Sequence, residues 1–228
     1  MYYEPRRQGS TLKVKTQSTK VNKAWLNDHV NDPYVKKAQA EGYRARAAYK
    51  LKEIDEAFGL FKPGMVVVDL GSSPGAWSQY LRRCMAPDGS ASGDLDGSLF
   101  AVDLLPMQPI EGVAFLQGDF RDQEVFDQLV AQIGHRAVDA VVSDMAPNLS
   151  GIADVDASRM VHLIELAIEF CQLHMKKDGS LVVKVFHGNG YDQVVQLFKD
   201  TFQLVKPFKP KASRAKSSEN FLVGLRLK

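Results

Sequence analysis

The chain of 228 residues lacks the features that mark membrane, secreted and metal-binding proteins. Its only cysteines, Cys84 and Cys171, form no C-x-x-C pair, so neither a disulfide framework nor a cysteine zinc site is expected. No apolar run reaches the ~18 residues of a membrane-spanning helix, and the basic N-terminal segment has no apolar stretch like that of a secretory signal. The five histidines show no metal-ligand spacing. The sequence therefore predicts a cytoplasmic protein with no membrane partner and no metal.

No single sign of charge dominates, since 29 lysines and arginines face 27 aspartates and glutamates. The charges are nevertheless segregated: residues 1–62 carry 13 basic and 7 acidic side chains, and residues 199–228 carry 8 and 2. Basic ends around an acidic middle suit a polyanion bound on a face built from both ends of the chain. The alternative, charges scattered over solvated faces, stays open because folding could separate the two basic segments.

Apolar runs alternate with helical patterns after a polar, basic segment at residues 1–22, which we expect to form a flexible tail. Helices are predicted near residues 23–30, 33–41, 44–58, 76–85, 121–133, 155–176 and 190–200. Strands are predicted at residues 65–70, 98–103, 113–117, 138–143 and 180–186, with two more within 203–210 and 219–227. This alternation predicts one α/β domain over residues 23–228. Its seven-stranded sheet would be mostly parallel, with helices on both faces and an antiparallel pair at the C-terminal edge.

The segment D-L-G-S-S-P-G-A-W, from Asp69 to Trp77, joins the first strand to a helix through a glycine turn. Glycines allow close approach of a ligand to the backbone, and the helix start offers unpaired N–H groups. The turn has only Gly71 and Gly75, separated by the stiffening Pro74, so it matches neither the three-glycine dinucleotide fingerprint nor a P-loop. S-adenosylmethionine therefore fits better than NAD or ATP. A tight turn without a ligand remains the alternative.

Two carboxylates follow the next two strands of the predicted sheet. Asp103 ends the second strand, where a carboxylate can accept hydrogen bonds from ribose hydroxyls. Asp119 ends the third strand and could reach an adenine ring, although by itself it is also a plausible helix N-cap. Because open α/β sheets bind ligands at the carboxyl ends of their strands, the pair favours a cofactor site there.

Two lysines and two further carboxylates lie in segments that could contribute to a catalytic site. Asp144 ends the fourth strand, and Pro147 excludes helix there, so this carboxylate would be presented at the cleft. Lys184 lies inside the apolar strand L-V-V-K-V-F, where a lysine is unfavourable unless it is paired, functional or on an edge strand reaching water. A buried amine of this kind can act as a general base. Lys50 and Glu219 would be unremarkable alone.

Basic side chains cluster near the C-terminal end of the sequence, where we expect contact with RNA. Residues 206–216 hold five cations and no carboxylate, which a solvated connection between strands does not need. The residues expected to touch RNA phosphates are Arg44, Arg46, Lys209, Lys211, Arg214 and Lys216.

These motifs, in this order, resemble the FtsJ family of ribosomal RNA 2′-O-ribose methyltransferases. The likeness runs from about residue 24 to the C-terminus and is carried by R-A-x-Y-K-L around Lys50, V-V-D-L-G-S-S-P-G-A-W-S-Q-Y, D-L-L-P-M, F-L-Q-G-D-F-R-D, S-D-M-A-P-N-x-S-G, V-V-K-V-F and S-R-A-K-S-S-E. It implies a Rossmann-like methyltransferase core at residues 63–228, preceded by helices at 23–62 that contribute to RNA binding. It also implies S-adenosylmethionine as the methyl donor. The catalytic tetrad would be Lys50, Asp144, Lys184 and Glu219.

Further roles and the substrate also follow from this resemblance. Gly71, Pro74, Gly75 and Trp77 would shape the methionine end of the cofactor pocket, with Asp144 close by, and Asp103 and Asp119 would hold the adenosine. The substrate would be a uridine in the A-loop of 23S rRNA, within the large ribosomal subunit, and the enzyme would act as a monomer. Three alternatives stay open: an mRNA-cap 2′-O-methyltransferase, a non-catalytic RNA-binding ribosome assembly factor, and a small-molecule methyltransferase. The chain departs from the family in its longer N-terminal tail and in an extended small-residue loop at Gly89–Gly97, which we expect to be mobile.

Overall fold

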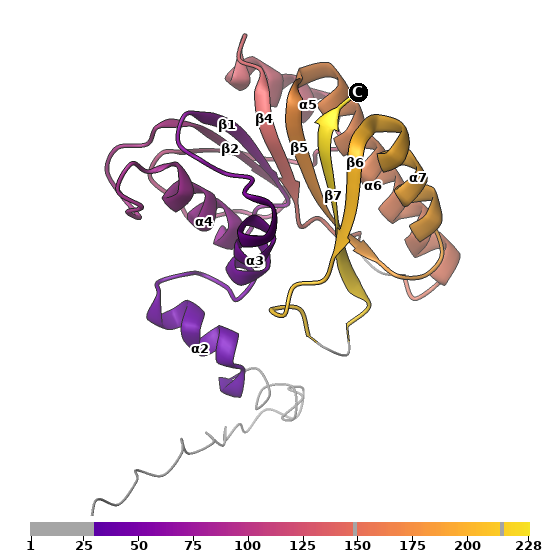
Figure 1. Ribbon diagram of the computed structural model, residues 1–228, viewed down its shortest axis with the longest axis horizontal. Coiled ribbons are helices and arrows are strands. Elements are labelled where there is room, and N and C mark those ends of the chain that lie inside the picture. The colour runs from indigo at the N-terminus through magenta and orange to yellow at the C-terminus, as the bar shows by residue number, and fades with distance from the viewer. Residues whose placement is uncertain (1–29, 148–149, 215–216) are drawn as a thin grey trace, which may run out of the picture.

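The fold is a seven-stranded mixed sheet between two layers of helices, as seen in a computed structural model that describes residues 30–147, 150–214 and 217–228. The strand order is β3-β2-β1-β4-β5-β7-β6. The bounds are β1 Met65–Leu70, β2 Gly97–Asp103, β3 Val113–Gln117, β4 Val138–Ser143, β5 Met175–Phe186, β6 Phe202–Phe208 and β7 Glu219–Leu227. β1 to β5 pair in parallel, and β7 lies antiparallel between β5 and β6 (Figure 1). The predicted fold class is confirmed, including the antiparallel pair at the edge.

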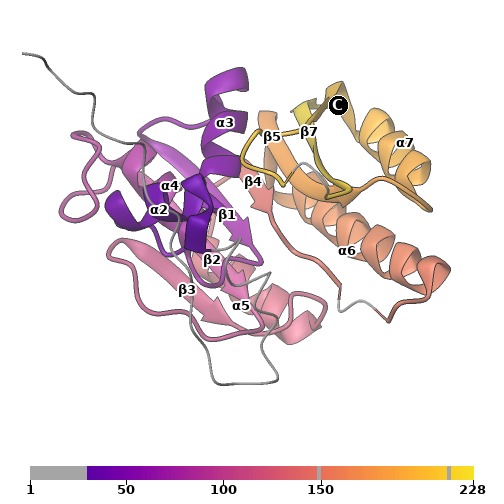
Figure 2. The ribbon, with the colours of Figure 1, turned by 90° about the horizontal axis from the view of Figure 1, so that it is seen from below.

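Helices cover both faces of the sheet. Their bounds are α2 Pro33–Ala40, α3 Ala48–Phe58, α4 Ala76–Met85, α5 Gln123–Ile133, α6 Ala153–His174 and α7 Tyr191–Thr201. α3 and α4 lie on one face, with α2 beside them, and α5, α6 and α7 lie on the other (Figures 1 and 2). The predicted helix near 23–30 lies outside the described residues, except for residue 30.

The core consists of two hydrophobic clusters, one for each face of the sheet. Because side chains alternate along a strand, β1 sends Val66, Val68 and Leu70 into the cluster under α5, α6 and α7. Val67 faces the other cluster, which includes Tyr49 and other side chains from α2, α3 and α4. The helices at residues 33–58 therefore share a core with the sheet.

The boundary between α6 and β5 differs from the prediction, which extended the helix to residue 176 and began the strand at 180. The helix ends at His174, and β5 begins at Met175. The register with β4 shifts between Val138 and Ala140, so the polar residues after Met175 form an irregular stretch that resembles a helix end in sequence. Pairing with β4 decides the boundary.

The start of α3 also differs, since the prediction began it at residue 44 and the helix begins at Ala48. Arg44 is held outside the helix because its backbone N–H donates to the Gln79 side chain (2.8 Å). Its guanidinium donates to the carbonyl oxygens of Pro74 (2.9 Å) and Gln108 (2.6 Å). Tertiary contacts therefore override the local helical pattern here.

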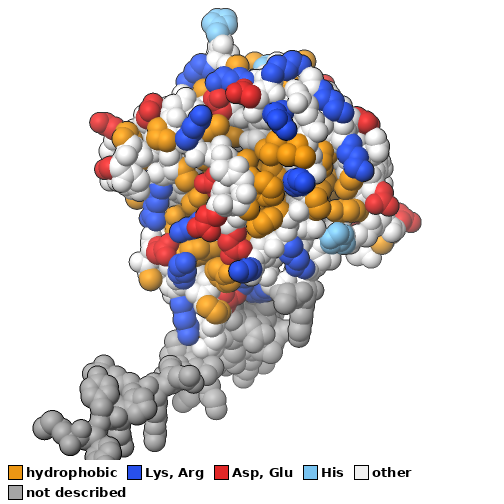
Figure 3. Space-filling model, viewed as in Figure 1, with side chains coloured by type: hydrophobic (Ala, Val, Ile, Leu, Met, Phe, Trp, Pro, Cys, Tyr) orange, Lys and Arg blue, Asp and Glu red, His pale blue; other side chains and the backbone are white. Residues whose placement is uncertain are grey.

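Part of the sheet has no helix over it. Figure 3 shows hydrophobic side chains gathered over β5, β7 and β6, where Figure 1 shows no helix in front of these strands. Phe208 and Leu225 are only partly buried there, and Phe208 contacts Phe58 of α3 edge-on at 5.6 Å between ring centroids. α3 thus reaches one corner of this face and leaves the rest open.

The loop at Gly89–Gly97 is attached to α4 through Arg82, whose side chain is fully buried. The guanidinium donates to the carbonyl oxygens of Ser90 (2.6 Å), Gly93 and Glu111 (3.2 Å). The expected mobility of this loop stays a prediction. Among the described residues, no helix is long and apolar enough to cross a membrane.

Candidate active site

The four residues of the expected tetrad meet at the carboxyl ends of the parallel strands. Lys50 comes from α3, Asp144 follows β4, Lys184 lies in β5 and Glu219 begins β7. The strand order places β4, β5 and β7 side by side, as the view onto this edge shows (Figure 2). All four side chains are 10–20% exposed. Four positions spread over 170 residues of sequence therefore form one partly buried cluster.

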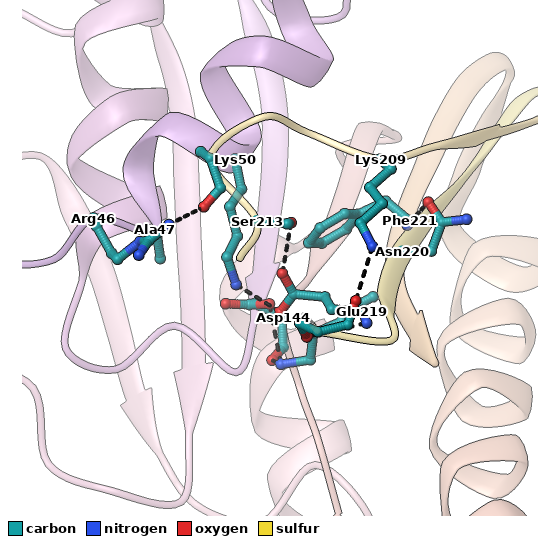
Figure 4. A network of polar contacts seen from close by, with 12 residues as sticks. Arg46, Ala47, Lys50, Asp144, Lys209, Ser213, Glu219, Asn220 and Phe221 are labelled. Atoms are coloured by element: carbon teal, nitrogen blue, oxygen red, sulfur yellow. Dashed lines mark hydrogen bonds and ion pairs between the residues drawn. The ribbon is translucent and has the colours of Figure 1, made fainter. Parts of the chain in front are cut away.

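The cluster consists of two ion pairs (Figure 4). The Lys50 ammonium donates to Glu219 Oε2 at 2.6 Å and lies 5.9 Å from the centroid of the Phe221 ring. Lys184 Nζ lies 3.1 Å from Asp144 Oδ1 and also donates to the backbone carbonyl of Asp144. Each of the two lysines thus has a counter-charge, which offsets the partial desolvation of its ammonium group.

Glu219 is held as a carboxylate from two sides. Its Oε1 accepts a hydrogen bond from the Ser213 hydroxyl at 2.7 Å, and its Oε2 accepts the one from Lys50. Burial by itself would raise the pKa of Glu219, but the charge and hydrogen bond of Lys50, the hydrogen bond of Ser213 and the charge of Lys184 outweigh it and lower the pKa. Glu219 therefore stays ionised and keeps Lys50 in place.

The glycine turn has positive φ angles at Gly71 (+77°) and Gly75 (+107°), which favour glycine. The space beside both residues is taken by protein atoms. A Cβ on Gly71 would lie 2.6 Å from the Met145 Cγ and 2.9 Å from the Met145 backbone N, and one on Gly75 would lie 2.7 Å from the Arg44 guanidinium. The chain after β4 and Arg44 therefore approach the turn closely in the directions of these Cβ positions, and the expected approach of a ligand to the turn stays a prediction. Pro74 lies between the two glycines, and its carbonyl accepts the bond from Arg44.

Trp77 lies on the tetrad side of α4, not along the turn. Its side chain is 3% exposed, its Nε1 donates to the carbonyl of Ala47 at 2.8 Å, and its ring lies 5.8 Å from that of Phe221. Ala47 immediately precedes α3, which carries Lys50. Trp77 is thus in position to support Lys50 and Glu219, whereas its expected place in the wall of a cofactor pocket stays a prediction.

Two buried polar atoms around the turn have no hydrogen-bond partner among the described residues: Asp69 Oδ1 and Ser72 Oγ. Asp69 and Ser72 flank the end of β1, and Asp144 follows the adjacent β4. Buried polar groups are nearly always satisfied in folded proteins, so these atoms indicate a polar ligand or ordered water. The residues present fit a cofactor with amine and carboxylate groups at this edge.

Burial raises the pKa of Asp69 to about 7; the hydrogen bond from Ser78 opposes this rise, and the charges of Asp144 and Asp103 add to it. The pKa of Asp69 in the folded protein lies above its ordinary value of 3.8, so the protonated carboxyl group stabilises the fold. This contribution is complete below pH 3.8 and is lost as the pH rises to about 7.

We therefore expect Asp69→Asn to flatten the pH dependence of stability. Relative to this variant, the parent should lose up to ~4 kcal/mol of unfolding free energy between pH 4 and pH 8. Chemical denaturation at several pH values measures this difference, with Asp178→Asn, an exposed carboxylate at the start of β5, as the control. If the unfolding free energies of the parent and of Asp69→Asn changed with pH in the same way, the raised pKa of Asp69 would be wrong.

Asp103 is the last residue of β2, as predicted, and Asp119 lies two residues after β3, but both carboxylates bind the protein. The Asp103 carboxylate accepts hydrogen bonds from the backbone N–H groups of Ser73 (2.8 Å) and Leu105 (2.7 Å). Asp119 accepts from Arg121 through side chain and backbone, and the side-chain hydrogen bond lowers its pKa despite partial burial. Asp119 is not the helix N-cap, which is Asp122. Asp103 therefore fixes the glycine turn, and only the remaining lone pairs of both carboxylates could serve a ligand.

The cations expected to touch RNA divide into two groups. Arg44 is bonded to three carbonyl oxygens, and Arg46 pairs with Asp32 and donates to the carbonyl of Ala212, so both connect elements of the fold. Lys209, Lys211 and Arg214 are exposed on the loop between β6 and β7, and Lys209 donates to the carbonyl of Ser217. Lys216 lies outside the described residues.

Sequence reasoning missed Ser213 and Asp69 as functional candidates. Ser213 lies in the S-R-A-K-S-S-E segment and Asp69 opens the glycine motif, so both were within recognised motifs. Their contacts with Glu219 and Ser78 were not readable from spacing. In the described part of the chain, no cluster of three or more His, Cys, Asp or Glu side chains is arranged to hold a metal ion.

Comparison with known proteins gives concordant matches in sequence. The profile of the FtsJ-like methyltransferase family matches residues 43–227. A protein of Acidovorax sp. (strain JS42), named ribosomal RNA large subunit methyltransferase E, is 69% identical over 217 residues, covering 95% of this chain and 99% of its own. The protein of the same name from Leptothrix cholodnii is 61% identical over 222 residues, covering 95% of this chain and 96% of its own.

Solved structures agree with this match. A crystal structure described as a ribosomal RNA methyltransferase, from Plasmodium falciparum, superposes with a TM-score of 0.70 at 26% identity, covering 81% of this chain and 98% of that one. The fibrillarin pre-rRNA processing protein of Methanococcus jannaschii shares the fold at a TM-score of 0.50 and 15% identity, covering 72% of this chain and 67% of that one.

Proposed function

Because the chain belongs to the FtsJ-like methyltransferase family, we propose that it methylates the 2′-oxygen of a ribose in 23S rRNA, with S-adenosylmethionine as the methyl donor. The target is a uridine of the A-loop in the large ribosomal subunit. Its place of action is the cytoplasm, where the ribosome is assembled. The names of the relatives, which specify the large ribosomal subunit, support the class of substrate.

One observation carries the proposal: two lysine–carboxylate pairs stand together at the strand ends, beside the glycine turn. A hydroxyl has to lose its proton to become a good nucleophile, and a positioned amine can accept it. Lys184 is the side chain best placed for this, because it comes from a central strand and Asp144 fixes the position of its Nζ.

The cofactor would be held at the ends of β1, β2 and β4. Asp69 and Ser72 each have a buried polar atom available for its amino and carboxylate groups, and Asp144 follows the adjacent strand β4. Asp103 and Asp119, at the next strand ends along the sheet, are available to the adenosine. When bound, S-adenosylmethionine supplies a methyl group activated by a positively charged sulfur.

The side chains of the tetrad then have distinct roles. Lys184 acts as a neutral amine: its Nζ takes the proton of the 2′-hydroxyl and becomes an ammonium group, while the methyl group moves from the sulfur to the ribose oxygen. Asp144 orients that amine through its carboxylate and its backbone carbonyl. Lys50, fixed by Glu219, provides positive charge beside the oxygen as negative charge develops on it. Holding the ribose oxygen in line with the methyl group contributes further rate by proximity.

RNA phosphates bind along the loop between β6 and β7, where Lys211 and Arg214 are exposed. Replacing both by alanine should weaken RNA binding. The slope of log affinity against log salt should become shallower by ~1.4–1.8, as expected for two lost phosphate contacts. The matched control replaces Lys62 and Lys177, exposed cations at the opposite, amino ends of β1 and β5. Filter binding across a salt series measures the RNA affinity and its salt dependence. Equal slopes for the two double variants would show that the loop between β6 and β7 does not bind RNA phosphates.

The rival functions predict different products. An mRNA-cap 2′-O-methyltransferase would methylate capped RNA, and a non-catalytic assembly factor would bind the subunit without transfer. The curated relatives, at 61–69% identity in the two cases compared, favour neither.

The direct test is transfer of a tritiated methyl group from S-adenosylmethionine to large ribosomal subunits that lack this modification. Digestion then identifies the labelled nucleotide. Label on one A-loop uridine, at its 2′-oxygen, is expected. Label on capped RNA alone, or no label despite cofactor binding, would refute the proposal.

A further inference from the structure

A cavity of about 370 Å³ opens beside the tetrad, on the side away from the glycine turn. Its lining residues come from the β4–α6 connection, the start of α6, the β5–α7 connection and the residue before β7: Pro147, Ala153, Asp156, Ala157, Met160, Phe186, His187, Gly188, Asn189 and Ser218. This volume is at the lower end of the roughly 300–1,000 Å³ of small-ligand sites. It suits a single nucleoside better than a longer stretch of RNA.

Residues that line the cavity are close neighbours in sequence of two tetrad residues, Lys184 and Glu219. Phe186 lies two residues after Lys184 in β5, and Ser218 immediately precedes Glu219. Phe186 and Glu219 are also register partners in the β5–β7 pairing, and the backbone N–H of His187 donates to the carbonyl of Ser218 at 3.1 Å. A group seated in the cavity is therefore next to whatever Lys184 and Glu219 hold.

The chemistry of the lining fits a neutral, flat, partly polar ligand. Met160, Phe186, Pro147 and the alanines supply apolar contact. Asp156, at the start of α6, adds negative charge, which disfavours a phosphate. Bases of single-stranded RNA are bound in this way, on apolar or aromatic side chains with polar groups at the edge.

Two polar groups on the β5–α7 connection have defined hydrogen-bonding directions. Asn220 Oδ1 accepts from the backbone N–H of Phe221 (3.0 Å), so its amide nitrogen faces His187 Nε2 at 3.0 Å and donates to it. Neutral His187 then carries its hydrogen on Nδ1 and is a donor there. Asn189 donates its amide nitrogen to Asp154 at 2.6 Å, which leaves its carbonyl oxygen to accept.

We propose that this cavity binds the base of the nucleotide whose ribose lies at the tetrad, and that it selects uracil. This inference rests on the proposed function and adds the site that reads the base. The Watson–Crick edge of uracil presents an N–H donor beside carbonyl acceptors, which the Asn189 carbonyl and the His187 N–H complement. Cytosine presents an acceptor nitrogen and an amino donor at the same edge, so it would oppose both groups.

Two variants test the proposal, and both alter exposed residues outside the tetrad. Ala153→Leu fills the cavity from the first turn of α6, and Ser158→Leu, on an exposed face of the same helix, is its control. Asn189→Ala removes the acceptor. The substrates are large subunits without the modification that carry either uridine or cytidine at the target position, and S-adenosylmethionine binding is measured in parallel.

We expect Ala153→Leu to lower kcat/KM on the uridine subunits by about tenfold or more, with cofactor affinity and the Ser158→Leu control unchanged. Asn189→Ala should reduce the preference for uridine over cytidine by roughly tenfold, since one hydrogen bond that discriminates is lost. Equal activity of the two leucine variants, or an unchanged preference in Asn189→Ala, would overturn the inference and leave the proposed function intact. If the parent enzyme labels neither kind of subunit, the proposed function itself fails.

Discussion

Lys184→Ala should abolish methyl transfer while leaving the cofactor bound. General-base catalysis contributes roughly 10²–10⁴-fold, so the methylation rate should fall by at least about a hundredfold. Asp69 lies at the end of β1, and Ser72 and the glycine turn follow directly after it, two strands away from Lys184, so the affinity for S-adenosylmethionine should change little. Single-turnover transfer and calorimetric titration of the cofactor measure the two quantities.

Removal of Lys184 also leaves Asp144 without its counter-charge, so folding has to be checked separately. Lys184→Met keeps the apolar stem and should be as inactive as the alanine variant. Lys206→Ala removes an exposed lysine from the nearby strand β6 and serves as the control for altered charge near the site. Substantial turnover in a folded Lys184→Met enzyme would show that Lys184 is not the base.

Gly71→Ala should be among the most damaging single-methyl additions in the chain. The new Cβ would overlap the Met145 side chain and backbone, and φ at this residue is +77°. Left-handed backbone adds about 1–2 kcal/mol for a residue with a side chain, and overpacking about 1–3 kcal/mol, so we expect a loss of ~3 kcal/mol of unfolding free energy. Because Met145 follows Asp144, the displacement should also lower methyl transfer.

Gly59→Ala separates the destabilisation caused by a left-handed backbone from that caused by overpacking. Gly59 is the C-cap of α3 with φ of +64°, and no atom lies within 4 Å of the position of its added Cβ. This variant should therefore lose only the backbone contribution of about 1–2 kcal/mol and keep its activity. Denaturant unfolding compares the two variants, and equal losses would show that the contact with Met145 is unimportant.

Several elements could be predicted to the residue. β1, β3, β4 and α4 have the bounds that the sequence indicated. Each is marked locally, since the strands are short apolar runs between turn residues and α4 begins directly after Gly75. The start of α3 and the junction of α6 with β5 were misplaced because Arg44 and the pairing with β4 decide them, and neither is local in sequence.

The candidate site could also be predicted from the sequence only in part. The motifs identified Lys50, Asp144, Lys184 and Glu219, and the alternating elements placed them near strand ends. The sequence could not show which lysine pairs with which carboxylate. It also could not show that Ser213 holds Glu219.

Thus the sequence by itself determined the α/β class, the glycine turn and, through its motifs, the family and the four residues expected to form the tetrad. These follow from local patterns of polarity and backbone freedom. Only the tertiary structure decided that Trp77 supports the start of α3, that Arg44 fills the space at Gly75 and that a cavity opens beside Glu219. Each of these depends on contacts between segments far apart in the sequence, and their geometry is set only when both faces of the sheet are packed.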